Sequence, residues 1–94
     1  MVTHIVFFKL EEPEIHAPII CEKLLGLKDR IPEIVSIQAG VDFLHSERSY
    51  DMALIVTFND REGLKVYDEN PDHNEVRKYI HAHRLDSKTV DFFS

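Results

Sequence analysis

The stretch Val2–Leu10, VTHIVFFKL, decides the fold because it is apolar on both sides of an extended chain. Its even positions carry aliphatic and aromatic side chains, interrupted by His4, and its odd positions include Ile5 and Phe7. No turn residue lies inside it. Alternation with a period of two is typical of a β-strand. Two apolar sides predict a strand that is covered on both faces.

The same two-sided pattern returns in Asp51–Phe58, where Ala53 and Ile55 alternate with a second apolar row. Ile34–Phe43 alternates apolar with polar residues and predicts a further strand. The polar stretch His45–Ser49 between them predicts a turn.

Helical patterns separate these strands. Pro18 suits a first turn, and apolar residues at i, i+4, i+7 and i+11 predict a helix over about 17–30 that Pro32 stops. Asn59, with Glu62 three residues on, predicts the N-cap and capping-box partner of a second, short helix.

Asn70-Pro71 interrupts that second helical region. Asn70 can cap and Pro71 can open a further helical piece that ends near His83. Thr89–Phe93 predicts the last strand. The order strand, helix, strand, strand, helix, strand predicts an α+β ferredoxin-like sandwich, a single domain over residues 1–94 with its helices on one face of an antiparallel sheet.

Helices on one face leave the other face of the sheet uncovered. That face would carry Ile5, Phe7, Ala53 and Ile55, and monomers seldom expose apolar patches of this size. The same face of a second copy, related by a two-fold axis, is the simplest cover. We therefore expect a homodimer with these residues in its interface.

Composition excludes several partners. With 11 Lys and Arg against 17 Asp and Glu the formal charge is −6, so no basic field favours nucleic acid. No run approaches the ~20 apolar residues of a membrane span. The lone Cys21 and the absence of a basic leader favour the cytoplasm. His81 and His83 are two residues apart and cannot share a helix face, so we expect no metal site. The sequence contains no glycine-rich phosphate-binding loop, so we expect no cofactor.

Three residues could carry proton-transfer chemistry. Tyr67 and His73 would lie roughly 120° apart on an unbroken helix, and the Asn70-Pro71 break lets them converge. His4 interrupts an apolar strand face. An imidazole can act as acid or base near neutral pH and a phenol can donate to a carbonyl oxygen. The alternative is that each residue is structural, with the rings packed and the polar atoms satisfied.

Several short motifs in order resemble one known family, the stress-responsive A/B barrel domain (Dabb) family. They are His4–Lys9, Ile31-Pro32 followed by Gly40, Tyr50-Asp51, Tyr67 with Asn70-Pro71-Asp72-His73, and Val90-Asp91-Phe92. The resemblance covers essentially the whole chain. It implies that ferredoxin-like subunits pair into a dimeric α+β barrel, in agreement with the two-sided strands.

One plant branch of this family closes linear polyketides by an aldol-type cyclisation. The resemblance implies that Tyr67 and His73 would do acid-base work, with His4 close by, and that a mostly apolar pocket would surround them. Its lining is expected to be Val6, Phe8, Cys21, Leu24, Met52 and Leu54. Met52, Cys21 and Leu24 differ from the plant residues, as does Asn70 in the motif, which argues against the plant substrate.

Two hypotheses of different class follow. The first is a homodimer that binds a small carbonyl or phenolic compound and catalyses its enolisation, cyclisation or isomerisation without a cofactor. The second is a non-catalytic dimer, either a ligand carrier or a stress-associated stabiliser. Other dimeric α+β barrels are cofactor-free monooxygenases, but the motifs of that chemistry are not visible in this sequence.

Overall fold

A computed structural model describes residues 1–94. Its elements are β1 (Val2–Leu10), α1 (Pro13–Leu25), the 3₁₀ turn η1 (Gly26–Asp29), β2 (Ile34–Val41), β3 (Met52–Phe58), α2 (Arg61–Glu69), α3 (Pro71–His83) and β4 (Arg84–Phe93). The strands form one antiparallel sheet in the order β2-β3-β1-β4. The predicted α+β ferredoxin-like topology is confirmed.

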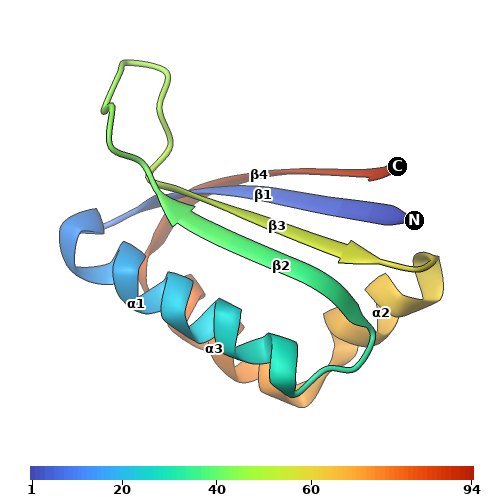
Figure 1. Ribbon diagram of the computed structural model, residues 1–94. Helices are drawn as coiled ribbons and strands as arrows, with labels where there is room; N and C mark the ends of the chain where they lie inside the picture. The colour runs from blue at the N-terminus through green and yellow to red at the C-terminus, as the bar shows by residue number, and fades with distance from the viewer.

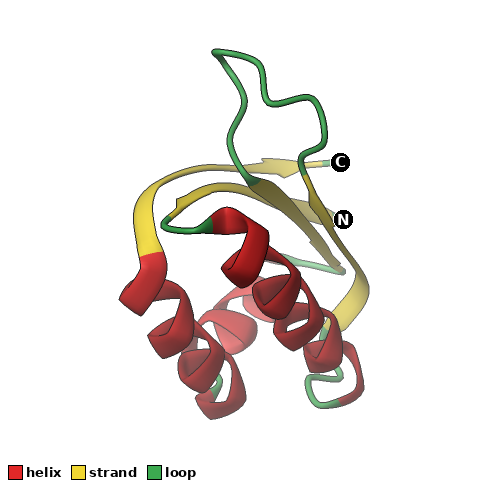
Figure 2. Cartoon of the chain, turned by 90° about the vertical axis from the view of Figure 1, so that its left-hand side faces the viewer, coloured by secondary structure: helices red, strands yellow, loops and turns green.

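The helices lie together on one face of the sheet, and the opposite face carries none (Figure 1). Turned by a quarter, the molecule shows two layers, with the β2–β3 loop rising from the side of the sheet away from the helices (Figure 2). The helix-facing rows of β1 and β3 form the core with α1, and Ile20, Leu24, Val56 and Phe58 are completely buried. The core therefore fills only one side of the sheet.

The register of β1 between β3 and β4 defines the other face. Ile5 pairs with Ile55 and Val90, and Phe7 pairs with Ala53. Phe7 is 46% exposed and Val90 60% exposed. A contiguous apolar surface thus remains on the sheet, which we call the outer face.

The first helix begins earlier than the sequence predicts. It starts at Pro13 and not near residue 17, so Pro18 lies inside it. Proline fixes φ near the helical value, which suits Pro13 at the helix start. Pro18 has no N–H to donate to the carbonyl of Glu14, so the helix loses one backbone hydrogen bond there, and Glu14 is exposed to water. Leu25 ends the α-helix, and the chain continues as η1.

The N-cap of α2 is Asp60 and not Asn59. The Asp60 carboxylate accepts a hydrogen bond of 2.9 Å from the backbone N–H of Gly63. Both residue types are good caps, so sequence preference cannot choose between adjacent positions. Gly63 suits this position, because a Cβ there would make a tight contact of 3.2 Å with the Cβ of Phe58.

The last strand is longer than predicted, since β4 follows α3 directly and begins at Arg84 instead of Thr89. Its first half is polar and gives no strand pattern, but it pairs with the far end of β1, where Leu10 faces Arg84 and Phe8 faces Ser87. Figure 2 shows this strand curving up from the end of the helix. The second strand ends at Val41, two residues earlier than expected.

Candidate active site

The break between α2 and α3 brings Tyr67 and His73 into contact. Tyr67 lies in the last turn of α2, and His73 lies in the first turn of α3. Asn70 caps α3 as expected, its side-chain oxygen accepting from the backbone N–H groups of Asp72 (2.8 Å) and His73 (3.4 Å). The two rings stack with centroids 4.0 Å apart at 25°. Both side chains are buried.

The ring of His73 is oriented by the backbone of Tyr67. Its Nδ1 lies 2.9 Å from the Tyr67 carbonyl oxygen, and because a carbonyl can only accept, Nδ1 carries the proton and donates. The Nε2 atom is then unprotonated and free to act as a base. Arg77 Nη2 lies 3.0 Å from the same Nδ1, but it donates to the Asp68 carbonyl and to Asp68 Oδ1, both at 2.9 Å.

Burial sets the protonation state of both groups. Loss of solvation, with a smaller contribution from the positive charge of Arg77, lowers the pKa of His73 to about 4 against the opposing effect of the hydrogen bond to Tyr67. Burial raises the pKa of Tyr67 well above its ordinary value. At neutral pH the pair is therefore a neutral imidazole beside a protonated phenol.

The hydroxyl of Tyr67 is buried and has no hydrogen-bond partner in the protein. Buried polar groups are nearly always paired, and an unpaired one costs about 1–3 kcal/mol. A buried donor without a partner requires an explanation. A functional role, in which an atom of a ligand accepts the hydrogen bond, is one such explanation.

His4 comes to this site from β1. It sits directly opposite Asp91 of β4, and its Nδ1 lies 2.5 Å from Asp91 Oδ1, so it donates to the carboxylate. Its ring meets that of Tyr67 edge-on with centroids 6.1 Å apart. Asp91 was not a predicted site residue, because its pairing with His4 depends on the β1–β4 register.

The three polar residues line one cavity of about 270 Å³. The remaining lining residues are Val6, Phe8, Leu24, Leu54, Ile80, Asp68, Arg77, His81, Arg84, Ser87 and Thr89. The cavity thus has an apolar wall from the core and a polar rim between α3 and β4. The β4 side of the rim was not predicted, because residues 84–88 show no strand pattern.

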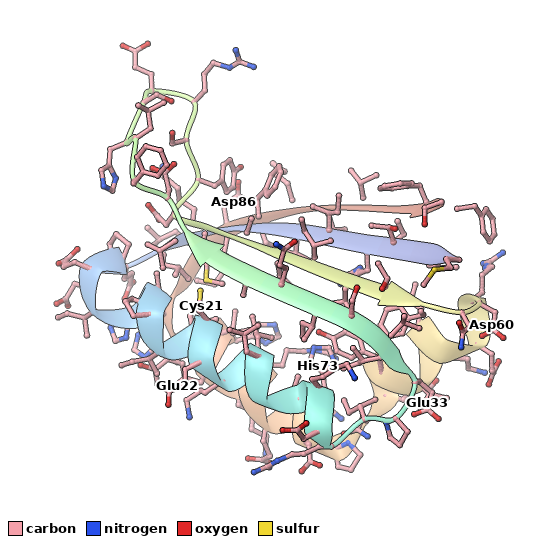
Figure 3. All side chains as sticks on the ribbon, viewed as in Figure 1. Cys21, Glu22, Glu33, Asp60, His73 and Asp86 are labelled. Atoms are coloured by element: carbon pink, nitrogen blue, oxygen red, sulfur yellow. The ribbon has the colours of Figure 1, made fainter.

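Two predicted lining residues, Cys21 and Met52, lie outside this cavity. Figure 3 shows His73 in the layer between sheet and helices, and Cys21 nearer the end where the β2–β3 loop rises. Cys21 is buried, and burial raises the pKa of its thiol, which disfavours the reactive thiolate. Cys21 is therefore an unreactive residue of the core. Met52 is buried at the start of β3 and borders a hollow of about 410 Å³ on the outer face beside Phe7 and Ala53.

No group of three or more His, Cys, Asp or Glu side chains gathers where it could hold a metal ion. None of the helices is both long and apolar enough to span a membrane. A larger hollow of about 590 Å³ between α1 and α3 is lined mostly by charged side chains and holds none of the three predicted catalytic residues. The cavity around His73 is the one in which those three residues meet.

Known structures share this fold over nearly the full chain. A dimeric, ferredoxin-like protein of unknown function from Bacteroides fragilis is 24% identical, with a TM-score of 0.91 over 99% of this chain and 95% of that one. The hydroxynitrile lyase of Passiflora edulis is 18% identical, with a TM-score of 0.83 over 97% and 90% of the two chains. A cofactor-independent oxygenase from Streptomyces nogalater is 14% identical, with a TM-score of 0.78 over 99% and 91%.

Comparison with curated proteins gives no match. The sequence model of the Stress Responsive A/B Barrel Domain, in contrast, matches residues 2–94. That match spans the whole sheet, its helices and the cavity between them. The chain therefore belongs to the stress-responsive A/B barrel domain family.

Proposed function

We propose that the cavity binds a small carbonyl or phenolic compound and catalyses proton transfer at the carbon next to the carbonyl group. His73 is the base, Tyr67 is the hydrogen-bond donor, and His4 assists. The observation that carries this proposal is the unpartnered, buried hydroxyl of Tyr67 stacked against a neutral His73 in one cavity.

The proposed reaction begins when the substrate's carbonyl oxygen accepts a hydrogen bond from Tyr67. This bond satisfies the orphaned hydroxyl and draws electron density from the carbonyl, which makes the adjacent C–H bond more acidic. Nε2 of His73 removes that proton, and the resulting enolate oxygen stays hydrogen-bonded to Tyr67. The enolate is then reprotonated or attacks a second carbonyl, and His73 returns its proton, so no cofactor is needed.

The surroundings of His73 suit this cycle. The Tyr67 carbonyl holds Nδ1–H and aims Nε2 away from the backbone, so the tautomer is fixed before substrate binds. Burial and Arg77 disfavour the imidazolium. The protonated base is therefore short-lived and returns its proton readily to the enolate.

His4 supplies a second imidazole next to the same phenol ring. Because Asp91 accepts the hydrogen bond from Nδ1, the imidazole ring is held in a fixed orientation beside the site. We propose a positioning or relay role for it, with a milder effect on rate than that of His73.

We also propose that the protein is a homodimer paired through its outer faces. Ile5, Phe7, Ala53 and Ile55 lie there as expected, and β4 adds Val90 and Phe92. Phe92 is 44% exposed, which is costly for a phenyl ring in water. The dimeric state of the Bacteroides fragilis relative supports this arrangement.

The alternative, a non-catalytic carrier or stress-associated dimer, uses the same cavity without chemistry. The lyase and oxygenase relatives show that this fold hosts enzymes, which supports the catalytic proposal. Fold alone does not decide between the two, because one fold serves many functions.

Deuterium exchange distinguishes these alternatives. The protein is incubated in D₂O with small methyl ketones such as acetophenone and 4-hydroxyacetophenone, and loss of the methyl proton signal is followed by NMR. The catalytic proposal predicts exchange that is about 10²–10⁴-fold slower in His73→Asn. His45→Asn, an exposed histidine in the β2–β3 loop and outside the cavity, is the matched control and should retain most of the rate. Binding without enhanced exchange would establish the carrier alternative.

A further inference from the structure

Basic residues at the end of α3 and the start of β4 line one side of the cavity. Arg77 and His81 lie at i and i+4, a spacing that places them on the same side of α3, and Arg84, the first residue of β4, follows directly after the helix. All of them line the cavity that holds Tyr67 and His73. We call these residues the basic column.

The positive charge of this column is only partly balanced. Arg77 Nη2 pairs with Asp68 at 2.9 Å, so that charge is compensated and the guanidinium is held in place at the wall. Its other N–H groups have no acceptor in the protein. Arg84 takes part in none of the ion pairs of the chain. One uncompensated guanidinium therefore remains at the rim.

The arrangement of the cavity divides it into three zones. Tyr67, His73 and His4 form the polar end that would hold a carbonyl group. Leucine, valine, phenylalanine and isoleucine side chains form the apolar part of the lining, and Arg84 forms a second polar part with the hydroxyls of Ser87 and Thr89. Arg77 lies beside His73, with its Nη2 3.0 Å from Nδ1. A volume of about 270 Å³ equals that of about nine liquid water molecules, which suits a ligand of similar heavy-atom number.

We propose that the ligand is a small carbonyl compound that carries a carboxylate at its other end, bound by Arg84. This inference rests on the proposed function of the same cavity and names its substrate class. A planar guanidinium matches a carboxylate through two parallel hydrogen bonds. One uncompensated positive charge matches a carboxylate better than a phosphate monoester, which carries about −1.5 to −2 at neutral pH.

Matched acids and amides test the charge requirement at constant shape. The probes are 4-acetylbenzoate with 4-acetylbenzamide, and 4-oxopentanoate with 4-oxopentanamide, so each pair keeps its methyl ketone and differs only in the anion. Dissociation constants are measured by NMR titration of the full-length protein. The acid of at least one pair should bind about tenfold more tightly than its amide, and the preference should shrink in high salt.

Charge-matched variants assign the preference to Arg84. Arg84→Gln should reduce the preference for the acid to about onefold, while amide binding stays the same. Arg61→Gln is the control, because Arg61 is exposed, unpaired and outside the cavity, and it removes the same net charge. It should leave the preference near tenfold. An equal effect of both variants would show only long-range electrostatics and would overturn the assignment.

Tyr67→Phe separates failure of this inference from failure of the proposed function. If acid and amide bind equally, yet both bind more weakly to Tyr67→Phe, the carboxylate inference is wrong and the proposed carbonyl site stands. If neither probe pair binds, or if Tyr67→Phe binds all probes as the wild type does, the proposed function is wrong and the inference falls with it. Tighter binding of 4-acetylphenyl phosphate than of 4-acetylbenzoate would also overturn the carboxylate assignment.

Discussion

Replacing Tyr67 by Phe should stabilise the ligand-free protein while it weakens the proposed site. The substitution deletes one buried hydroxyl and keeps the ring that packs on Phe58 and His73. Most buried Tyr→Phe changes destabilise a protein because they break a hydrogen bond. Here the hydroxyl makes none, so its removal leaves no partner unsatisfied.

The expected size follows from the cost of burying an unpaired polar group, about 1–3 kcal/mol. Part of this is offset by the small gap left after the oxygen atom is removed, so we expect the free energy of unfolding to rise by about 1 kcal/mol. For a domain of this size that change raises Tm by roughly 4–8 °C. Deuterium exchange into methyl ketones should fall at the same time.

Tyr79→Phe is the matched control on the same helical layer. The Tyr79 hydroxyl lies 2.9 Å from His16 Nδ1, so its loss should lower the free energy of unfolding by about 0.5–1.5 kcal/mol. Chemical denaturation of the wild type and both variants measures all of these quantities. A Tyr67→Phe protein that is destabilised as much as Tyr79→Phe would refute the reasoning, because it would show that the Tyr67 hydroxyl has a partner in the folded protein.

Further predictions address protonation, assembly and the helix cap. Because the pKa of His73 is lowered to about 4 in the folded protein from about 6.5 when unfolded, the unfolded chain binds the extra proton first, and stability should fall by about 3 kcal/mol as pH drops through that window. His73→Asn should flatten this part of the stability profile, and an unchanged slope would contradict the assignment. Light scattering should give roughly twice 11.0 kDa for the wild type, and Phe7→Glu should dissociate the dimer, since it would bury an unpaired charge at a cost of several kcal/mol. Ile15→Glu, an equivalent change on the exposed side of α1, should leave the mass unchanged, and a wild-type mass of 11.0 kDa at micromolar concentration would rule out the dimer. Asp60→Ala should lower the unfolding free energy by about 1 kcal/mol and Asn59→Ala should have little effect, whereas the reverse order would restore Asn59 as the cap.

Strong periodic signals made the central part of the fold predictable. The two-sided alternation of Val2–Leu10 and Asp51–Phe58 identified the paired strands at the middle of the sheet, and both lie there. The Asn70-Pro71 dipeptide located the helix break, because Asn caps and Pro opens a helix for independent physical reasons. Such local rules are enough to bring Tyr67 beside His73.

Features that depend on register or on the edge of the sheet were not predictable. The first half of β4 is mostly polar and forms a strand because it pairs with β1. Residues 84–88 therefore show no apolar alternation from which a strand could be predicted. For the same reason Asp91 and the cavity rim were missed. The prediction that Cys21 and Met52 line the cavity is wrong for a related reason. The helix-facing rows extend well beyond the cavity, so membership of such a row does not determine whether a residue borders it.

The pH dependence of deuterium exchange into a methyl ketone tests the central claim most directly, namely that a neutral, buried His73 acts as the base beside Tyr67. The rate is measured by NMR from acidic to neutral pH for the wild type and for His4→Asn. With the pKa of His73 lowered to about 4, the exchange rate in the presence of the protein should stay level from neutral pH down to about pH 5 and fall only as pH passes through about 4. His4→Asn should lower the rate and keep that midpoint. A midpoint near the ordinary histidine value of about 6.5, or one that disappears in His4→Asn, would contradict the assignment of His73 as the base.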